Sequence, residues 1–106
     1  MGLFTAKPYK LDSLNFAEKA AVRTALEVAQ MLDTQGKLKK QLNNALKDLD
    51  KGKMSREDLA TSVACLAASL SAMSNSEDPD RSSLLAKKKV ATVAMALALD
   101  KLKNML

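Results

Sequence analysis

The segment from Lys47 to Asp58, KDLDKGKMSRED, has the length and the central glycine of an EF-hand calcium loop. In such a loop calcium takes oxygen ligands from the first, third and fifth positions. Those positions hold Lys47, Leu49 and Lys51 here, because the aspartates between them are out of phase by one residue. We therefore expect no metal at this segment and interpret it as a helix–turn–helix junction, in which Gly52 ends the first helix.

Cys65 is the only cysteine, and the sequence has no histidine. A zinc site of Cys and His ligands is therefore not expected, and no imidazole is available to activate the thiol. Cys65 lies between Ala64 and Leu66, a setting that favours a small core residue. We expect no enzymatic activity and no cofactor, because no glycine-rich phosphate loop or nucleophile elbow is present. The carboxylates that could supply acid–base chemistry are not brought into one pocket by any pattern: Asp33, Asp48, Asp50, Glu57 and Asp58.

Lysines gather in two parts of the sequence and could bind a polyanion. Residues 37–53 hold six basic and two acidic side chains, and residues 81–106 hold six basic and one acidic. Because residues 54–80 hold one basic and five acidic side chains, the same lysines are also explained as a solvated surface beside an acidic helix. Binding of nucleic acid or another polyanion is the alternative function, and its candidate residues are Lys37, Lys39, Lys40, Lys87, Lys88 and Lys89.

Several features argue against sequence-specific reading of nucleic acid. Arginine is the usual reader of guanine edges, and only Arg23 and Arg56 are expected within helices. A recognition helix after the junction would open with Glu57 and Asp58, whose carboxylates repel phosphate. We also expect no aromatic platform on which single-stranded bases could stack, since the chain has only 2 Phe, 1 Tyr and 0 Trp.

The apolar residues are mostly helix formers, with 18 Leu, 17 Ala and 6 Met against 5 Val and no Ile. Only 3 Gly and 2 Pro punctuate the chain, so a sheet of many short strands is not expected. Hydrophobic periodicity predicts one all-α domain over residues 13–106, a compact bundle of about four helices. Residues 1–12 show no helical period and predict an extended N-terminal arm. The expected helices cover approximately residues 13–35, 37–50, 55–74 and 82–104.

Local signals mark where these helices begin and end. Asn15 with Glu18 three residues later matches a capping box, and Ser55 matches an N-cap. Gly36 and Gly52 stand where left-handed C-caps are expected. Small residues recur every four positions in the first helix, a spacing that lets another helix approach closely. This row consists of Ala17, Ala21, Ala25 and Ala29.

The last predicted helix carries apolar residues over roughly 200° of its circumference, about twice the stripe that one packing face needs. Either this helix is central in the bundle, or its second face meets another molecule. From the second alternative we expect a small non-enzymatic protein-interaction or oligomerisation module, whose partner is another protein or a second copy. The expected docking residues are Leu84, Ala91, Met95, Ala98 and Leu102.

The longest apolar stretch, Val90–Leu99, is far shorter than the about 20 residues that span a bilayer. Neither a secretory signal nor a pair of cysteines for a disulfide is apparent. The sequence therefore predicts a cytoplasmic protein.

Overall fold

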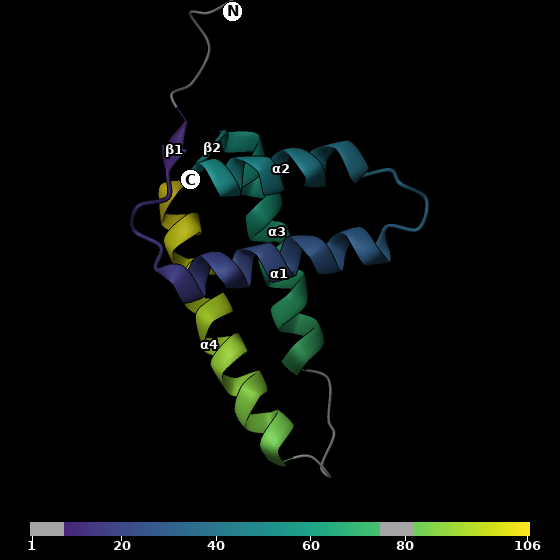
Figure 1. The fold of residues 1–106 in the computed structure, drawn as a ribbon, viewed down its shortest axis with the longest axis vertical. Coiled ribbons are helices and arrows are strands. Elements are labelled where there is room, and N and C mark those ends of the chain that lie inside the picture. The colour runs from purple at the N-terminus through teal and green to yellow at the C-terminus, as the bar shows by residue number, and fades with distance from the viewer. Residues whose placement is uncertain (1–7, 75–81) are drawn as a thin grey trace, which may run out of the picture.

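Four helices and one short antiparallel strand pair make up the part of the chain that the structure describes (Figure 1). The computed structural model describes the backbone of residues 8–74 and 82–106 and the side chains of residues 8–72 and 92–106. α1 and α2 run alongside each other, and α3 and α4 cross them (Figure 1). This arrangement confirms the predicted all-α bundle. The elements are β1 (Tyr9–Lys10), α1 (Phe16–Leu32), α2 (Lys39–Lys51), β2 (Lys53–Met54), α3 (Arg56–Ser74) and α4 (Ser82–Met105).

The first helix begins at the predicted capping box. Asn15 Oδ1 accepts a hydrogen bond from the Glu18 N–H at 2.8 Å, and Glu18 Oε1 accepts one from the Asn15 N–H at 2.8 Å. Two N–H groups at the start of the helix are thereby satisfied. The prediction for the other end was wrong, because α1 ends at Leu32 with Asp33 as its C-cap. Gly36 lies three residues further on, in the α1–α2 connection, with a φ of 70°.

The junction between α2 and α3 agrees with the prediction from the sequence. Gly52 is the C-cap of α2 with a φ of 77°, a left-handed conformation that a glycine adopts without steric cost. Ser55 Oγ accepts a hydrogen bond from the Asp58 N–H at 3.1 Å and caps the start of α3. The predicted helix–turn–helix junction is therefore confirmed, with β2 inserted between its two helices.

The strand pair is the one element that the sequence did not predict. β1 and β2 are antiparallel, with Tyr9 opposite Met54 and Lys10 opposite Lys53. The next residue, Leu11, donates its N–H to the carbonyl oxygen of Gly52 at 2.9 Å, and its side chain is fully buried. The last residues of the predicted arm are thus part of the bundle, while residues 1–7 lie outside the described residues.

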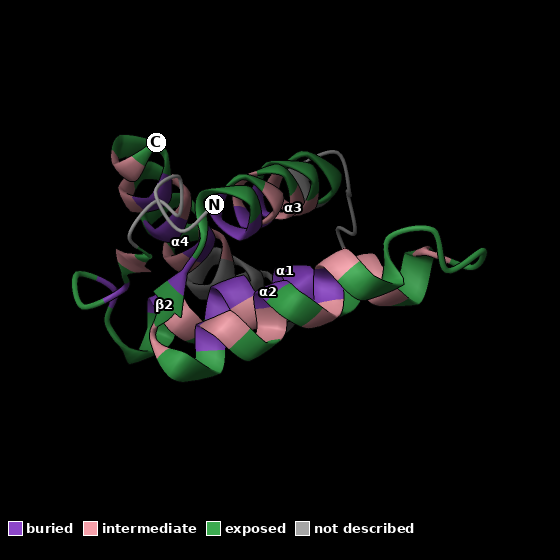
Figure 2. Cartoon of the chain, turned by 90° about the horizontal axis from the view of Figure 1, so that it is seen from above, coloured by how far each residue is buried: buried purple, intermediate pink, exposed green. Residues whose placement is uncertain are grey.

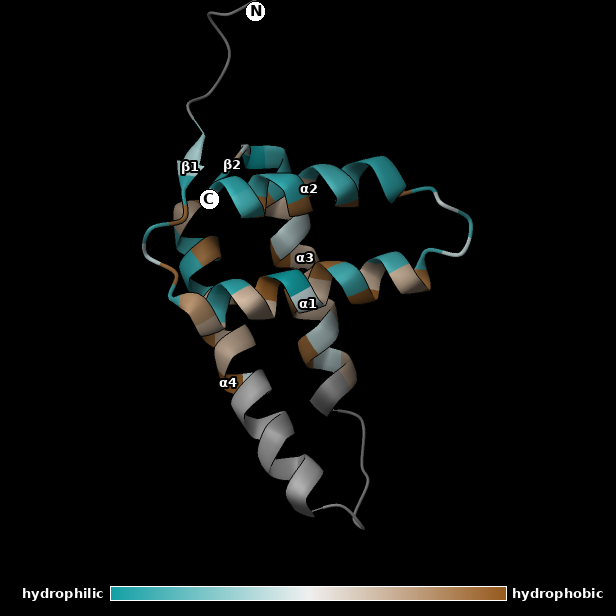
Figure 3. Cartoon of the chain, in the orientation of Figure 1, coloured by the Kyte–Doolittle hydropathy of each residue, from teal (hydrophilic) through white to brown (hydrophobic). Residues whose placement is uncertain are grey.

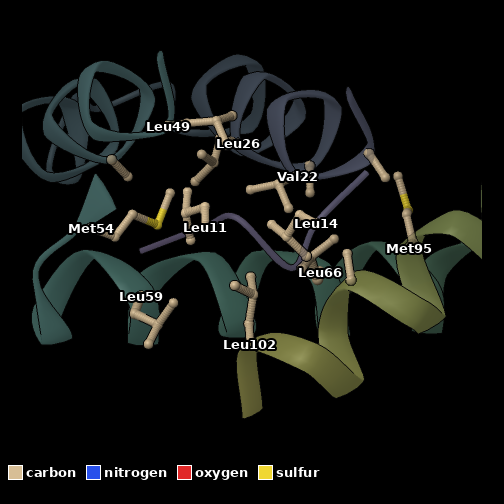
Figure 4. Packing of buried hydrophobic residues seen from close by; sticks show 14 of the residues in the cluster. Leu11, Leu14, Val22, Leu26, Leu49, Met54, Leu59, Leu66, Met95 and Leu102 are labelled. Carbon is tan, nitrogen blue, oxygen red and sulfur yellow. The ribbon is translucent and has the colours of Figure 1, made fainter. Parts of the chain in front are cut away.

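The core lies where all four helices meet. Leu11, Leu26 and Met54 point toward one another in its interior (Figure 4). Buried residues of α1 and α2 lie on the sides of these helices that turn toward the other pair, whereas the α1–α2 connection is almost entirely exposed (Figure 2). The amphipathic character of α1 and α2 therefore sets how the helix pairs pack.

An ion pair ties the start of α1 to the last turns of α4. Lys101 Nζ donates hydrogen bonds to Glu18 Oε1 and to the Ser13 carbonyl oxygen, each at 2.8 Å. The Glu18 side chain is only 2% exposed and that of Lys101 is 37% exposed. The hydrogen bond from Lys101, together with that from the Asn15 N–H, holds the pKa of Glu18 below its usual value.

Candidate functional site

The predicted docking residues of α4 belong mainly to the core. Met95 is 4% exposed, and Ala98 and Leu102 are fully buried, because α1 and α3 pack against α4. The described part of α4 thus buries these three residues against the bundle, whereas Val93 and Leu97 of the same helix are 58% and 48% exposed. These three side chains do not reach the surface of the folded chain, which corrects their assignment to a docking face. The side chains of Leu84 and Ala91 lie outside the described residues.

The predicted polyanion-binding lysines are placed only in part. Lys37, Lys39 and Lys40 are exposed. Lys37 and Lys40 share a shallow hollow with Glu57 and Asp58 of the acidic first turn of α3. That neighbourhood offsets part of the lysine charge, as expected for a solvated surface. The side chains of residues 87–89 lie outside the described residues.

The fold brings together a carboxyl pair that the sequence did not connect. Asp58 is 8% exposed, and burial together with the hydrogen bond that its protonated carboxyl donates to the neighbouring Asp48 raises the pKa of Asp58 to about 6. Asp48 Oδ2 also accepts a hydrogen bond from the Ser55 N–H at 3.4 Å. Among the described residues, no group of three or more His, Cys, Asp or Glu side chains is arranged to hold a metal ion. Asp58 in its protonated form therefore links α3 to α2 through its hydrogen bond to Asp48.

An apolar groove of about 410 Å³ lies between the C-terminal half of α1 and the middle of α3. Val28 and Leu32 of α1 line it, together with Leu38 from the α1–α2 connection. Leu32 is 76% exposed and Leu38 is 48% exposed. Hydrophobic residues continue to the last turn of α1, next to this groove (Figure 3). The side of the groove on α3 consists of small residues that recur every four positions, Ala64, Ala68 and Ala72.

Two polar groups of the groove are already accounted for within the chain. The carboxylate of Asp33 accepts hydrogen bonds from the N–H groups of Lys37, at 3.1 Å, and Leu38, at 2.8 Å. Cys65 is half-buried against the core, and burial raises the pKa of its thiol. A thiol with a raised pKa is a weak nucleophile at neutral pH, so its position fits a packing residue.

The sequence held one signal for this groove. The alanine row of α1 predicted a close approach of another helix, and Ala21 and Ala25 are indeed buried in the core. Ala29, the next member of the row, lines the groove instead. Where the row leaves the core depends on the crossing of α1 and α3, which the spacing of alanines does not specify.

None of the helices in the described ranges combines the length and the apolar character that crossing a membrane requires. No protein-family model, curated protein sequence or solved structure matches this chain.

Proposed function

We propose that this chain is a non-enzymatic oligomerisation module, and that two copies associate through the apolar groove between α1 and α3. The observation that carries this proposal is the exposure of Leu32, at 76%, and Leu38, at 48%, in a groove walled by alanines. Contiguous exposed apolar surface of this kind marks interaction sites on proteins. The module acts in the cytoplasm under this proposal, where its single cysteine stays reduced.

The shape of the surface supports a second copy as the occupant. Leu32, on the last turn of α1, is large and exposed, and the hollow that it lines is bounded by Ala64 and Ala68 of α3. In a symmetric dimer each contact is made twice, because the same patch is used by both copies. A two-fold axis near Leu32 lets each copy place its exposed side chains against the alanines of the other.

Charge also supports self-association at this groove. The chain has a net charge of +5, which opposes contact between two copies over most of the surface. No lysine or arginine lines the described groove, and its only charged residue, Asp33, is hydrogen-bonded within the chain. Two copies that meet here do not bring lysines face to face. An acidic partner would instead favour the lysine-rich surfaces.

Sedimentation equilibrium from micromolar to millimolar concentration tests the proposal. We expect a reversible monomer–dimer equilibrium for the wild type and a monomer at all concentrations for Leu32→Lys. Lysine places a charge in the apolar contact, yet it is favourable in the last turn of a helix, so α1 keeps its stability. The matched control is Leu97→Lys, because Leu97 is 48% exposed on α4 and does not line the groove. This control should dimerise like the wild type.

Cys65 provides an independent readout, since it lines the groove and is the only cysteine. Its reaction with a thiol reagent should slow as the wild-type protein is concentrated, and it should not slow for Leu32→Lys. A wild-type chain that stays monomeric over the whole range contradicts the proposal. So does a Leu97→Lys variant that dissociates while Leu32→Lys does not.

A further inference from the structure

A second concave surface, a cleft of about 790 Å³, lies where the start of α1, the end of α2 and the strand pair meet. Cationic side chains from all three elements line it, and none of them is among the six lysines named above as candidates for polyanion binding. Two carboxylates, Asp12 and Asp50, also line the cleft. The cationic residues are Lys10, Lys19, Arg23, Lys51 and Lys53.

The charge of this cleft is unbalanced within the described residues. Asp50 forms an ion pair with Arg23, which leaves Asp12 as the one other carboxylate among four lysines. Lys10 and Lys53 stand directly opposite each other in the β1–β2 pair. Like charges at opposing positions destabilise a strand pair, so the arrangement does not serve the stability of the fold. A bound anion would relieve this repulsion.

An aromatic ring lies in the same cleft. Phe16 is 90% exposed, although a phenylalanine usually lies at least partly buried. It is the first residue of α1, directly after the Asn15 cap, so the helix fixes its position. The sequence alone did not predict Phe16 as a platform for a base. Lysines beside an exposed ring are the combination that binds single strands, in which phosphates contact the cations and a base stacks on the ring.

We propose that this cleft binds single-stranded nucleic acid, with phosphates on its four lysines and one base stacked on Phe16. A bilayer surface is too flat to follow a concave wall, and an acidic polypeptide supplies carboxylates but does not require the face of an aromatic ring. The cleft shares no lining residue with the groove proposed for dimerisation. The two proposals therefore stand or fail separately.

The charge component is tested by fluorescence anisotropy with a labelled oligothymidylate of about 12 nucleotides. Four phosphate contacts predict that log K falls with log salt with a slope of about −3, since each contact with a single strand contributes about −0.7. The double variant Lys10→Gln/Lys53→Gln should bind more weakly, with a slope of about −1.5. The control Lys39→Gln/Lys40→Gln removes the same charge from an exposed surface outside the cleft and should keep the wild-type slope.

The stacking component is tested at Phe16. Phe16→Tyr keeps the aromatic face and should bind like the wild type. Phe16→Leu keeps an apolar side chain without that face and should bind about 5- to 100-fold more weakly, with an unchanged salt slope. Because Phe16 is exposed, both variants should keep the helical circular dichroism of the wild type, and this is measured alongside.

Polyglutamate and phosphatidylserine-containing vesicles serve as competitors in the same assay. We expect neither to displace the oligonucleotide at equal charge concentration. The proposal is overturned by undetectable binding at low salt, or by equal losses in the two double-lysine variants. It is also overturned if Phe16→Leu binds like the wild type. Displacement by polyglutamate together with that last result would assign the cleft to an acidic polypeptide instead.

Discussion

Glu18 is a buried carboxylate, and the free-energy cost of burying its charge depends on Lys101, near the opposite end of the chain. Its carboxylate accepts hydrogen bonds from the Asn15 N–H and from Lys101 Nζ, and it is 2% exposed. Lys101, at 37% exposed, keeps part of its hydration. Loss of the lysine would therefore cost more than the bond itself contributes, because an unpaired carboxylate would remain buried.

We predict that Lys101→Met lowers the free energy of unfolding by about 2–3 kcal/mol at pH 7. Lys103→Met is the matched control, because Lys103 is exposed on the same helix, and it should change stability by less than about 0.5 kcal/mol. Urea unfolding followed by circular dichroism measures both. Equal effects of the two substitutions would show that the ion pair with Glu18 contributes nothing.

The pH dependence of the same variant provides a second check. A carboxyl whose pKa is lowered on folding contributes stability above its unfolded pKa of about 4.5, and this stability is lost as the pH falls through the folded pKa. Lys101→Met removes the largest cause of the lowered pKa. The acid-induced loss of stability should therefore be shallower in this variant than in the wild type.

At the scale of elements, the carboxyl pair between α2 and α3 changes stability with pH in the opposite direction to Glu18, because folding raises the pKa of Asp58. Folded Asp58 holds its proton up to a pH of about 6, whereas the unfolded side chain holds it only to about 3.8. The folded state thus binds more protons between these values, and its contribution to stability falls as the pH rises through that window. We predict that Asp58→Asn, which stays neutral and donates to Asp48, stabilises the protein by about 1–2 kcal/mol at pH 7.5.

Thermal unfolding at pH 4 and pH 7.5 measures this effect. The stabilisation by Asp58→Asn should be largely absent at pH 4, where the wild-type side chain is already protonated in the folded state. Glu27→Gln changes the charge of an exposed carboxyl on α1, away from Asp58, and serves as the control. A gain in stability of the same size at both pH values would argue against a protonated Asp58 in the folded wild type at pH 4.

The same scale shows which elements the sequence could predict. Asn15, Gly52 and Ser55 act through contacts within a few residues, so the helix ends that they determine were predicted correctly. The strand pair was not predicted because each strand has two residues and its partner lies more than forty positions away. The exposure of Phe16 beside the cleft was also not predicted, because it depends on how the strand pair meets α1.

For the whole molecule, the central position of α4 predicts where substitutions in this helix matter. Leu102→Ala should lower the free energy of unfolding by about 2–5 kcal/mol, because it leaves a cavity at a fully buried site. Leu97→Ala removes the same atoms from a side chain that is 48% exposed and should cost less than about 1 kcal/mol. Chemical denaturation of the two variants compares them. Similar costs would mean that Leu102 is not enclosed.

The apolar arc on α4 was predicted from the sequence, which does not specify what covers it. An arc that two neighbouring helices bury and one that a partner buries contain the same residue types at the same spacing. For Met95, Ala98 and Leu102 the answer is the chain's own core. The α1–α3 groove could not be predicted either. Leu32 has the spacing of a buried residue in an amphipathic helix, and it is exposed because of where α3 crosses α1.

The link between Glu18 and Lys101 has a consequence for synthesis. A ribosome releases α1, α2 and α3 before α4, so the nascent chain carries Glu18 without its cation and lacks the side chains of Met95 and Leu102. Such an incomplete chain exposes apolar surface, and exposed surface of this kind is what chaperones recognise on folding intermediates. We therefore expect the complete core to form only after position 102 has left the exit tunnel.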